Sequence, residues 1–305
     1  MRIKSGLLFL FVLTMVGCGT SENSGKPRVV VSILPQKWLV EQIVGDHVEV
    51  ITLVKSGDSP ATYQPSESQV SSVMGAKAYF RIGVPFENGG WFKSIEEAKQ
   101  LTIVDCRKGI TLRVMEGHHH DEEKEATNLE TEDQDDSICA CCQNGEDPHI
   151  WLTPKLLTIQ AETMTKTLKE IDPPNADTFQ KNFEDLKKRL EKLDAELHEK
   201  LEPMLGKPFF VFHPAWGYFA HEYGMAQFAI ERAGKDPSDS ELTELQEDAK
   251  WHGVKVIFVQ PQITGSGADA VARAINGRTV ELDPLSPEVE KNLRRVADEM
   301  LQIYQ

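Results

Sequence analysis

Residues 179–201 read FQKNFEDLKKRLEKLDAELHEKL, and this stretch decides how the fold is divided. Its apolar residues recur at spacings of three or four, which predicts one continuous amphipathic helix of roughly 35 Å. Asp172-Pro-Pro174 breaks the chain before it, and Pro203 lies at its end. We interpret residues 176–203 as a rigid linker helix between two lobes. A core helix or a coiled-coil seam is the alternative.

Short β-branched and aromatic runs lie on both sides of this helix and alternate with helical stretches, a pattern typical of βαβ units. The runs before the helix are 29–34, 48–54, 77–84 and 101–105, and those after it are 208–212, 226–230, 254–259 and 278–282. The predicted fold class is α/β, with two lobes that each hold a roughly four-stranded, mostly parallel sheet flanked by helices. The predicted division is an N-terminal lobe over 28–155, connecting helices over 156–206 and a C-terminal lobe over 207–305.

The N-terminus has the features of an export signal. Arg2 and Lys4 precede a short apolar run, and Met15-Val16-Gly17-Cys18 resembles a bacterial lipobox. We expect residues 1–17 to be removed, Cys18 to carry a lipid, and residues 18–27 to form a flexible tether. A plain secretory signal with an incidental Cys18 is the alternative. The expected location is the periplasmic or cell-surface side of a bacterial membrane.

The formal net charge of −15 is concentrated in one segment. Residues 116–147 hold 12 acidic residues and a single lysine, together with His118, His119 and His120. The segment has no apolar period, so we expect a mobile acidic loop that either gathers metal or is merely solvated. The acidity of the chain argues against nucleic-acid binding, which needs clustered Lys and Arg.

Four cysteines besides Cys18 permit at most two disulfides in an exported protein. They are Cys106, Cys139, Cys141 and Cys142. A bond from Cys106 to a cysteine of the loop is plausible, but the sequence does not assign partners.

Two histidines and one aspartate lie at predicted strand ends or turns. His149 lies in the turn after the acidic loop, His213 ends the strand 208–212, and Asp283 follows the strand 278–282. Ligands of parallel α/β sheets bind beyond the carboxyl ends of the strands. Imidazole and carboxylate together suit a divalent metal. Taken singly, each residue also has a purely structural interpretation as part of a turn, strand end or helix cap.

Several short motifs occur in an order that resembles a known family. They are the lipobox, GDSPATYQP (57–65), DPHIWLTP (147–154), FHPAWGYFA (212–220) and LDPL (282–285). Together they resemble the zinc/manganese-type, TroA-like solute-binding lipoproteins of bacterial metal ABC transporters. The resemblance covers about residues 28–305. It implies two α/β lobes joined by a rigid helix, with a metal held between them by three histidines and an acid.

The resemblance assigns His149, His213 and Asp283 to three of these ligands, whereas the first histidine of the family is Ala61 in this chain. The chain therefore resembles a divergent branch with Pro-Ala-Thr-Tyr at this motif. Water, or one of several side chains, could complete the site. The candidate side chains are Glu231, Tyr63, His118, His119 and His120.

The resulting interpretation is a monomeric, lipid-anchored protein that captures a divalent metal and delivers it to the membrane permease of an ABC transporter. Zn²⁺ is the expected metal, with Mn²⁺ or another divalent ion as alternatives. A surface adhesin that has lost strong metal binding is a second interpretation. A metallohydrolase is a third, because two histidines and an aspartate with an open position also serve hydrolysis.

Overall fold

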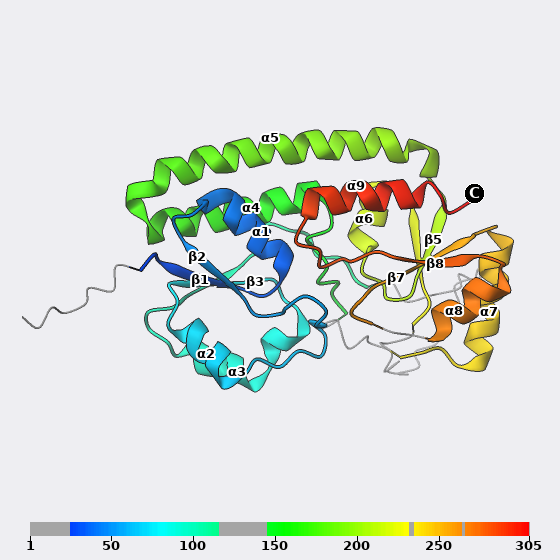
Figure 1. The fold of residues 1–305 in the computed structure, drawn as a ribbon, viewed down its shortest axis with the longest axis horizontal. Coiled ribbons are helices and arrows are strands. Elements are labelled where there is room, and N and C mark those ends of the chain that lie inside the picture. The colour runs from blue at the N-terminus through cyan, green and yellow to red at the C-terminus, as the bar shows by residue number, and fades with distance from the viewer. Residues whose placement is uncertain (1–24, 116–144, 232–234, 264–265, 305) are drawn as a thin grey trace, which may run out of the picture.

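Two four-stranded parallel sheets organise the computed structural model, which describes residues 25–115, 145–231, 235–263 and 266–304 (Figure 1). The N-terminal sheet has the order β2-β1-β3-β4, with β1 (Arg28–Val31), β2 (Glu49–Thr52), β3 (Ala78–Arg81) and β4 (Thr102–Asp105). The C-terminal sheet has the order β6-β5-β7-β8, with β5 (Pro208–Val211), β6 (Ala226–Ala229), β7 (Val256–Val259) and β8 (Arg278–Glu281). The predicted fold class is confirmed. Both sheets follow the same strand order, which reveals a structural repeat that the sequence did not show.

Helices cover the sheets and bury their apolar residues. The helices of the N-terminal half are α1 (Leu34–Val44), α2 (Glu67–Met74) and α3 (Gly90–Glu96), with a 3-10 turn η1 (Pro85–Asn88) before α3. The connecting part holds α4 (Pro154–Ile171) and α5 (Ala176–Leu201), flanked by the short 3-10 turns η2 (Pro173–Asn175) and η3 (Glu202–Met204). The C-terminal half holds α6 (Gly217–Glu222), α7 (Asp239–Trp251), α8 (Ser266–Ala274) and α9 (Val289–Met300). Central strand residues such as Val30 and Phe210 are fully buried, as expected for parallel strands that are covered on both faces.

The first strand is shorter than predicted. The apolar run 29–34 predicted a strand to residue 34, but β1 ends at Val31 and α1 begins at Leu34. Pro35 lies in the first helical turn, where proline is well tolerated. The side-chain oxygen of Gln36 accepts hydrogen bonds from the backbone N–H of Ser32 at 2.9 Å and of Ile33 at 3.3 Å. A local cap therefore ends the strand early, and apolar composition alone does not reveal it.

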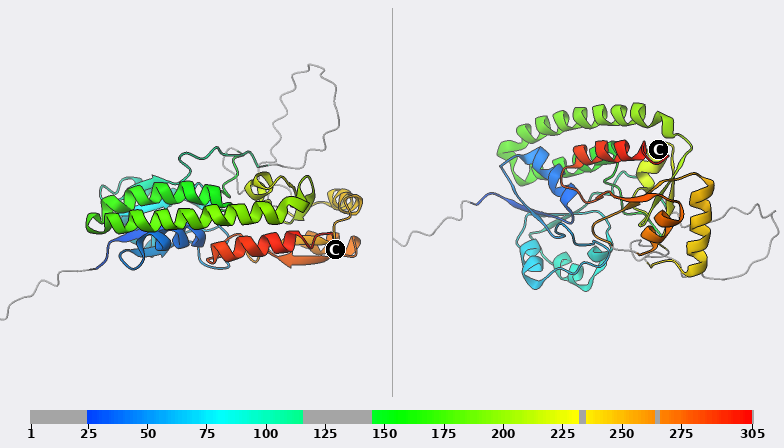
Figure 2. Two further views of the ribbon diagram at one scale, coloured as in Figure 1. Left: turned by 90° about the horizontal axis from the view of Figure 1, so that it is seen from above. Right: turned by 45° about the vertical axis from the view of Figure 1, so that its right-hand side comes forward.

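Helix α5 runs along both lobes, as Figures 1 and 2 show. It contacts α1 and α4 on the N-terminal side and α9 on the C-terminal side. All seven residues of its apolar stripe are buried: Phe179, Phe183, Leu186, Leu190, Leu193, Leu197 and Leu201. The predicted linker helix is confirmed, with its end at Leu201 in place of residue 203.

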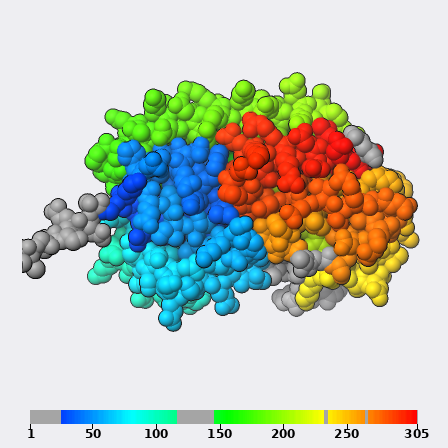
Figure 3. Space-filling view, viewed as in Figure 1, coloured from blue at the N-terminus to red at the C-terminus, as the bar shows by residue number. Residues whose placement is uncertain are grey.

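Polar contacts of α5 also reach both halves. The Arg189 guanidinium donates to Gln42 of α1 at 2.6 Å and lies 3.6 Å from the Glu290 carboxylate of α9. Arg294 of α9 binds Glu196 of α5 at 2.8 Å. The two lobes also contact each other directly along a continuous boundary in the space-filling view (Figure 3). Helix α5 therefore fixes the spacing of two lobes that already touch.

Cys106 lies in the core. Its side chain is fully buried and its thiol is free, so the bond to a loop cysteine that the sequence left open is not formed in this structure. Burial among apolar groups raises the pKa of the thiol well above its usual value, which keeps it unreactive. Cys139, Cys141 and Cys142 lie outside the described residues, as do His118, His119, His120 and Cys18.

The two ends of the acidic segment lie side by side. Val114 and Glu146 form an antiparallel bridge. The Met115 N–H donates to the Gly145 carbonyl at 2.8 Å, and the Asp147 N–H donates to Arg113 at 2.8 Å. This pairing therefore brings both ends of the segment next to the turn that holds His149. Within the described ranges, no helix combines the length and apolar character that a membrane crossing requires.

Replacing Leu193 by alanine tests whether α5 stabilises the whole molecule. Leu193 is fully buried, so Leu193→Ala should lower the free energy of unfolding by about 2–5 kcal/mol through lost burial and a residual cavity. Chemical denaturation followed by circular dichroism measures this change. The exposed neighbour Lys192→Ala is the matched control and should change stability by less than about 0.5 kcal/mol. Equal denaturation midpoints for Leu193→Ala and Lys192→Ala would show that the apolar stripe of α5 does not stabilise the molecule.

Candidate metal centre

His149 is held in place by the turn that follows the acidic segment. The Asp147 carboxylate accepts the His149 backbone N–H at 2.9 Å and contacts the ring Nδ1 at 2.7 Å. The histidine is 7% exposed, and this burial lowers its pKa. The ring is therefore neutral at neutral pH, with the proton on Nδ1 facing the carboxylate and a lone pair on Nε2.

His213 is held in the same way by a different carboxylate. It follows β5, and its Nδ1 lies 2.7 Å from Glu231 Oε1. Glu231 follows β6, and its backbone N–H donates to the Phe212 carbonyl at 3.0 Å. The sheet register thus places the carboxylate beside the ring. Carboxylates on Nδ1 are the common outer partners of metal-binding histidines, since they fix the tautomer and the ring orientation.

The two rings point their remaining nitrogens at each other. His149 Nε2 and His213 Nε2 are 3.4 Å apart. If both Nδ1 atoms carry protons, two lone pairs face each other, which is repulsive unless a cation lies between them. Two nitrogens bound to one tetrahedral Zn²⁺ at about 2.05 Å are separated by roughly 3.3 Å. The separation therefore fits two ligands of one metal ion.

Asp283 follows β8, as predicted, and precedes Pro284 and Leu285, which line the cavity that contains the two histidines. Its Oδ1 accepts hydrogen bonds from the Gln262 side-chain amide at 2.7 Å and from the Leu285 N–H at 2.9 Å. Among the described residues, Asp283 does not lie within 4.8 Å of both histidine ligand atoms. The structure thus brings His149 and His213 together and leaves the Asp283 carboxylate further from them.

A small cavity lies beside the two histidines. Its volume is about 30 Å³, which is enough for one or two water molecules. His149, His213 and Gln262 line it from one side, and Ser59, Pro60 and Ala61 line it from the N-terminal lobe. Ala61 therefore lies where the resemblance placed the missing histidine. Its methyl group offers no donor atom.

The structure places two of the candidate additional ligands away from the histidine Nε2 atoms. Glu231 contacts Nδ1 of His213, on the opposite edge of the ring from Nε2, and so orients the imidazole. The Tyr63 hydroxyl accepts a hydrogen bond from Gln69 at 2.6 Å, and its ring packs edge-on against Phe86. Tyr63 lines a neighbouring pocket with Ala61, but not the cavity between the histidines.

Sequence reasoning missed Gln262. Its amide nitrogen donates to Asp283, while its side-chain oxygen is buried and has no hydrogen-bond partner. A buried, unsatisfied oxygen costs about 1–3 kcal/mol, so its presence in a site needs an explanation. A metal ion in the cavity that Gln262 lines would satisfy it. The residue lies just beyond β7, and this position at a strand end was the available signal.

Two hydrogen bonds attach the His149 segment to the C-terminal lobe. The Trp151 indole donates to the Pro284 carbonyl at 2.7 Å, and the Tyr218 hydroxyl donates to the Asp147 carbonyl at 3.1 Å. The same hydroxyl accepts the Arg113 N–H at 3.0 Å. Burial raises the pKa of Tyr218 to about 12, which preserves the donor at any ordinary pH. His149 and His213 are thereby fixed relative to each other.

The fold and the site define a class of protein. Two parallel-sheet lobes joined by one long helix, with two pre-oriented histidines at the interface, form a metal-binding receptor of the solute-binding type. The family described as "Zinc-uptake complex component A periplasmic" matches residues 29–301, and the chain belongs to this family.

Individual relatives agree with this assignment. A "Putative metal-binding protein" of Chlamydia muridarum is 28% identical over 95% of this chain and 96% of its own length. The "High-affinity zinc uptake system protein ZnuA" of Bacillus subtilis is 29% identical over 90% of this chain and 85% of its own length. A crystal structure of a ZnuA deletion mutant with zinc bound is 33% identical and superposes with a TM-score of 0.78, covering 92% of this chain and 99% of the other.

Replacing Gln262 tests whether it belongs to the metal centre. Gln262→Leu removes the buried oxygen and the hydrogen bond to Asp283, so Zn²⁺ affinity should fall by about 10- to 100-fold. Competition with a fluorescent zinc chelator measures this change. Gln262→Glu keeps an oxygen donor at the same place and should retain more affinity than the leucine variant. Gln260→Leu, which also lines the cavity, serves as the matched control. Unchanged affinity in Gln262→Leu would exclude the residue from the site.

Proposed function

We propose that this protein captures Zn²⁺ outside the cytoplasm and delivers it to the permease of an ABC transporter. The observation that carries the proposal is the 3.4 Å separation of the two Nε2 atoms, each on a ring whose Nδ1 is held by a buried carboxylate. Membership of a zinc-uptake family supports the delivery step.

The donor set favours zinc over harder ions. Imidazole nitrogen suits Zn²⁺, whereas sites for Mn²⁺ usually hold more oxygen donors. The proposed ligands are His149 and His213, with Asp283 moving toward the metal when it binds. The Gln262 oxygen or a water molecule takes the position that Ala61 leaves without a donor. Mn²⁺ remains the alternative metal, because Asp283 and Gln262 are oxygen donors.

We propose a binding role without catalysis. The cavity beside the two histidines has a volume of about 30 Å³, which suits an ion and a water molecule. Both histidines already hold a carboxylate on Nδ1, an arrangement that serves ligand orientation. These observations support a metal receptor over a metallohydrolase.

Metal titration of two opposite variants tests the proposal. His213→Ala removes one of the two nitrogen donors and should weaken Zn²⁺ binding by at least about 100-fold. Ala61→His adds a donor to the cavity wall and should strengthen binding, since it completes a four-ligand site. Isothermal titration calorimetry with a competing chelator measures both affinities.

Thr62→His, one residue away, is the control for Ala61→His, because Thr62 does not line the cavity. A His213→Ala variant that binds Zn²⁺ as tightly as the unaltered protein would refute the proposed receptor function. Equal gains from Ala61→His and Thr62→His would show that Ala61 does not occupy a ligand position.

We further propose that the mature protein is anchored to a membrane through a lipid on Cys18. The lipobox and the polar tether of residues 18–27 support this location. Cys18→Ala should move the protein from the membrane to the soluble fraction of a bacterial expression host, and mass spectrometry should detect no lipid. Retention of the Cys18→Ala variant in the membrane fraction would contradict the anchor.

A further inference from the structure

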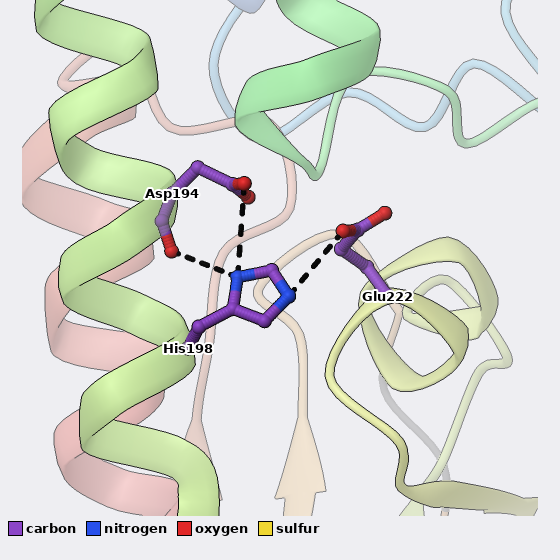
Figure 4. Close-up of side chains that lie close together, drawn as sticks. All are labelled: Asp194, His198 and Glu222. Carbon is purple, nitrogen blue, oxygen red and sulfur yellow. Dashed lines mark hydrogen bonds and ion pairs between the residues drawn. The ribbon is translucent and has the colours of Figure 1, made fainter.

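A second cluster of metal-binding side chains lies outside the metal centre, where α5 meets α6 (Figure 4). Asp194 and His198 lie one turn apart on α5, and Glu222 is the last residue of α6. One ligand atom from each residue falls within 4.8 Å of the others. Among the described residues, no other group of three His, Cys, Asp or Glu side chains meets this distance.

The hydrogen bonds of His198 direct one ring nitrogen at Glu222. Its Nδ1 lies 2.9 Å from the Asp194 backbone carbonyl, which can only accept a hydrogen bond. In the neutral ring, Nδ1 therefore carries the proton and Nε2 carries the lone pair. Nε2 faces Glu222 Oε1 at 3.5 Å, so a lone pair faces a carboxylate. This contact is favourable only with a proton or another cation between the two atoms.

The distances suit a metal of the zinc class. A nitrogen and an oxygen bound to one tetrahedral Zn²⁺ at about 2.0–2.2 Å are separated by roughly 3.4 Å. Asp194 Oδ2 lies 3.6 Å from His198 Nδ1, on the other side of the ring nitrogens from Glu222, and one ligand atom of each of the three residues lies within 4.8 Å of the others. Asp194 Oδ1 accepts a hydrogen bond from the Tyr223 hydroxyl at 3.1 Å. Tyr223 thus orients the carboxylate and leaves its second oxygen toward the cluster.

Lys155 already places a positive charge at this cluster. Its ammonium group bonds to Glu222 and lies 4.0 Å from Asp194 Oδ2. The two carboxylates are 16% and 19% exposed, whereas Lys155 is 57% exposed and can turn toward water. With Lys155 displaced, a divalent cation would balance both carboxylates. The cluster thus attracts cations. Lys155 of α4 competes with a metal ion for its two carboxylates.

We propose that Asp194, His198 and Glu222 form a second site for a divalent transition metal, and that Lys155 competes with the metal for it. A surface groove of about 400 Å³, lined by His198 and Glu222, gives the site direct access to solvent. The ligands are one nitrogen and two carboxylates, with water completing the shell. Its solvent-exposed position and built-in competitor make it weaker than the interlobe centre.

The site is tested by metal titration in a His213→Ala background, which disables the interlobe centre. Co²⁺ and Zn²⁺ are the probes, with stoichiometry from equilibrium dialysis at pH 7.5 and ligand geometry from the visible spectrum of bound Co²⁺. His198→Ala in this background should lose one equivalent of metal. Lys155→Met in this background should raise the affinity of that equivalent by about tenfold, because a repelling charge near 4 Å is removed.

His221→Ala in the same background is the matched control, because His221 lines the groove but is not one of the three ligands. The His221→Ala variant should bind as many equivalents of metal as its parent. Thermal unfolding of each apo variant checks that the fold is retained. If His198→Ala binds as many equivalents as its parent, there is no second site. If Lys155→Met fails to bind more tightly, Lys155 is not the competitor. Because every comparison is made within the His213→Ala background, failure here leaves the interlobe proposal untouched.

Discussion

The burial of one helical stripe is the constraint on which the rest of the structure depends. Helix α5 exposes its charged residues to solvent and buries seven apolar side chains against elements of both lobes. Fully burying a side chain of this size contributes about 1.5–3 kcal/mol. The stripe therefore holds the lobes at one separation, and at that separation Ser59, Pro60 and Ala61 of the N-terminal lobe line the cavity beside the two histidines.

The parts of the fold that depend on periodicity could be predicted from the sequence. The spacing from Phe179 to Leu201 predicted α5, and the alternation of strands and helices predicted two parallel sheets. The ends of strands could not be predicted in this way, because they depend on single side chains. The end of β1 is set by Gln36, which contacts backbone groups four and three residues earlier.

The candidate site shows the same limit. His149 and His213 could be recognised, because each lies in a distinctive turn or strand-end motif. The two carboxylates that hold these histidines differ in how far they lie from them along the sequence. Asp147 is two residues from its histidine, whereas Glu231 reaches His213 only through the pairing of β5 with β6. Gln262 is identified by an unsatisfied oxygen, which is a property of packing and not of sequence. The Asp194–His198–Glu222 cluster likewise joins two helices whose contact is tertiary.

The alanine at position 61 has a consequence for how such a receptor releases its cargo. Hydrogen bonds from Trp151 and Tyr218 attach the His149 segment to the C-terminal lobe, and His213, Gln262 and Asp283 belong to that lobe. The N-terminal lobe covers the cavity with Ser59, Pro60 and Ala61 but contributes no imidazole. Separating the lobes would then uncover the ion without breaking any histidine–metal bond. With the proposed ligands, opening of the lobes alone would not release the ion.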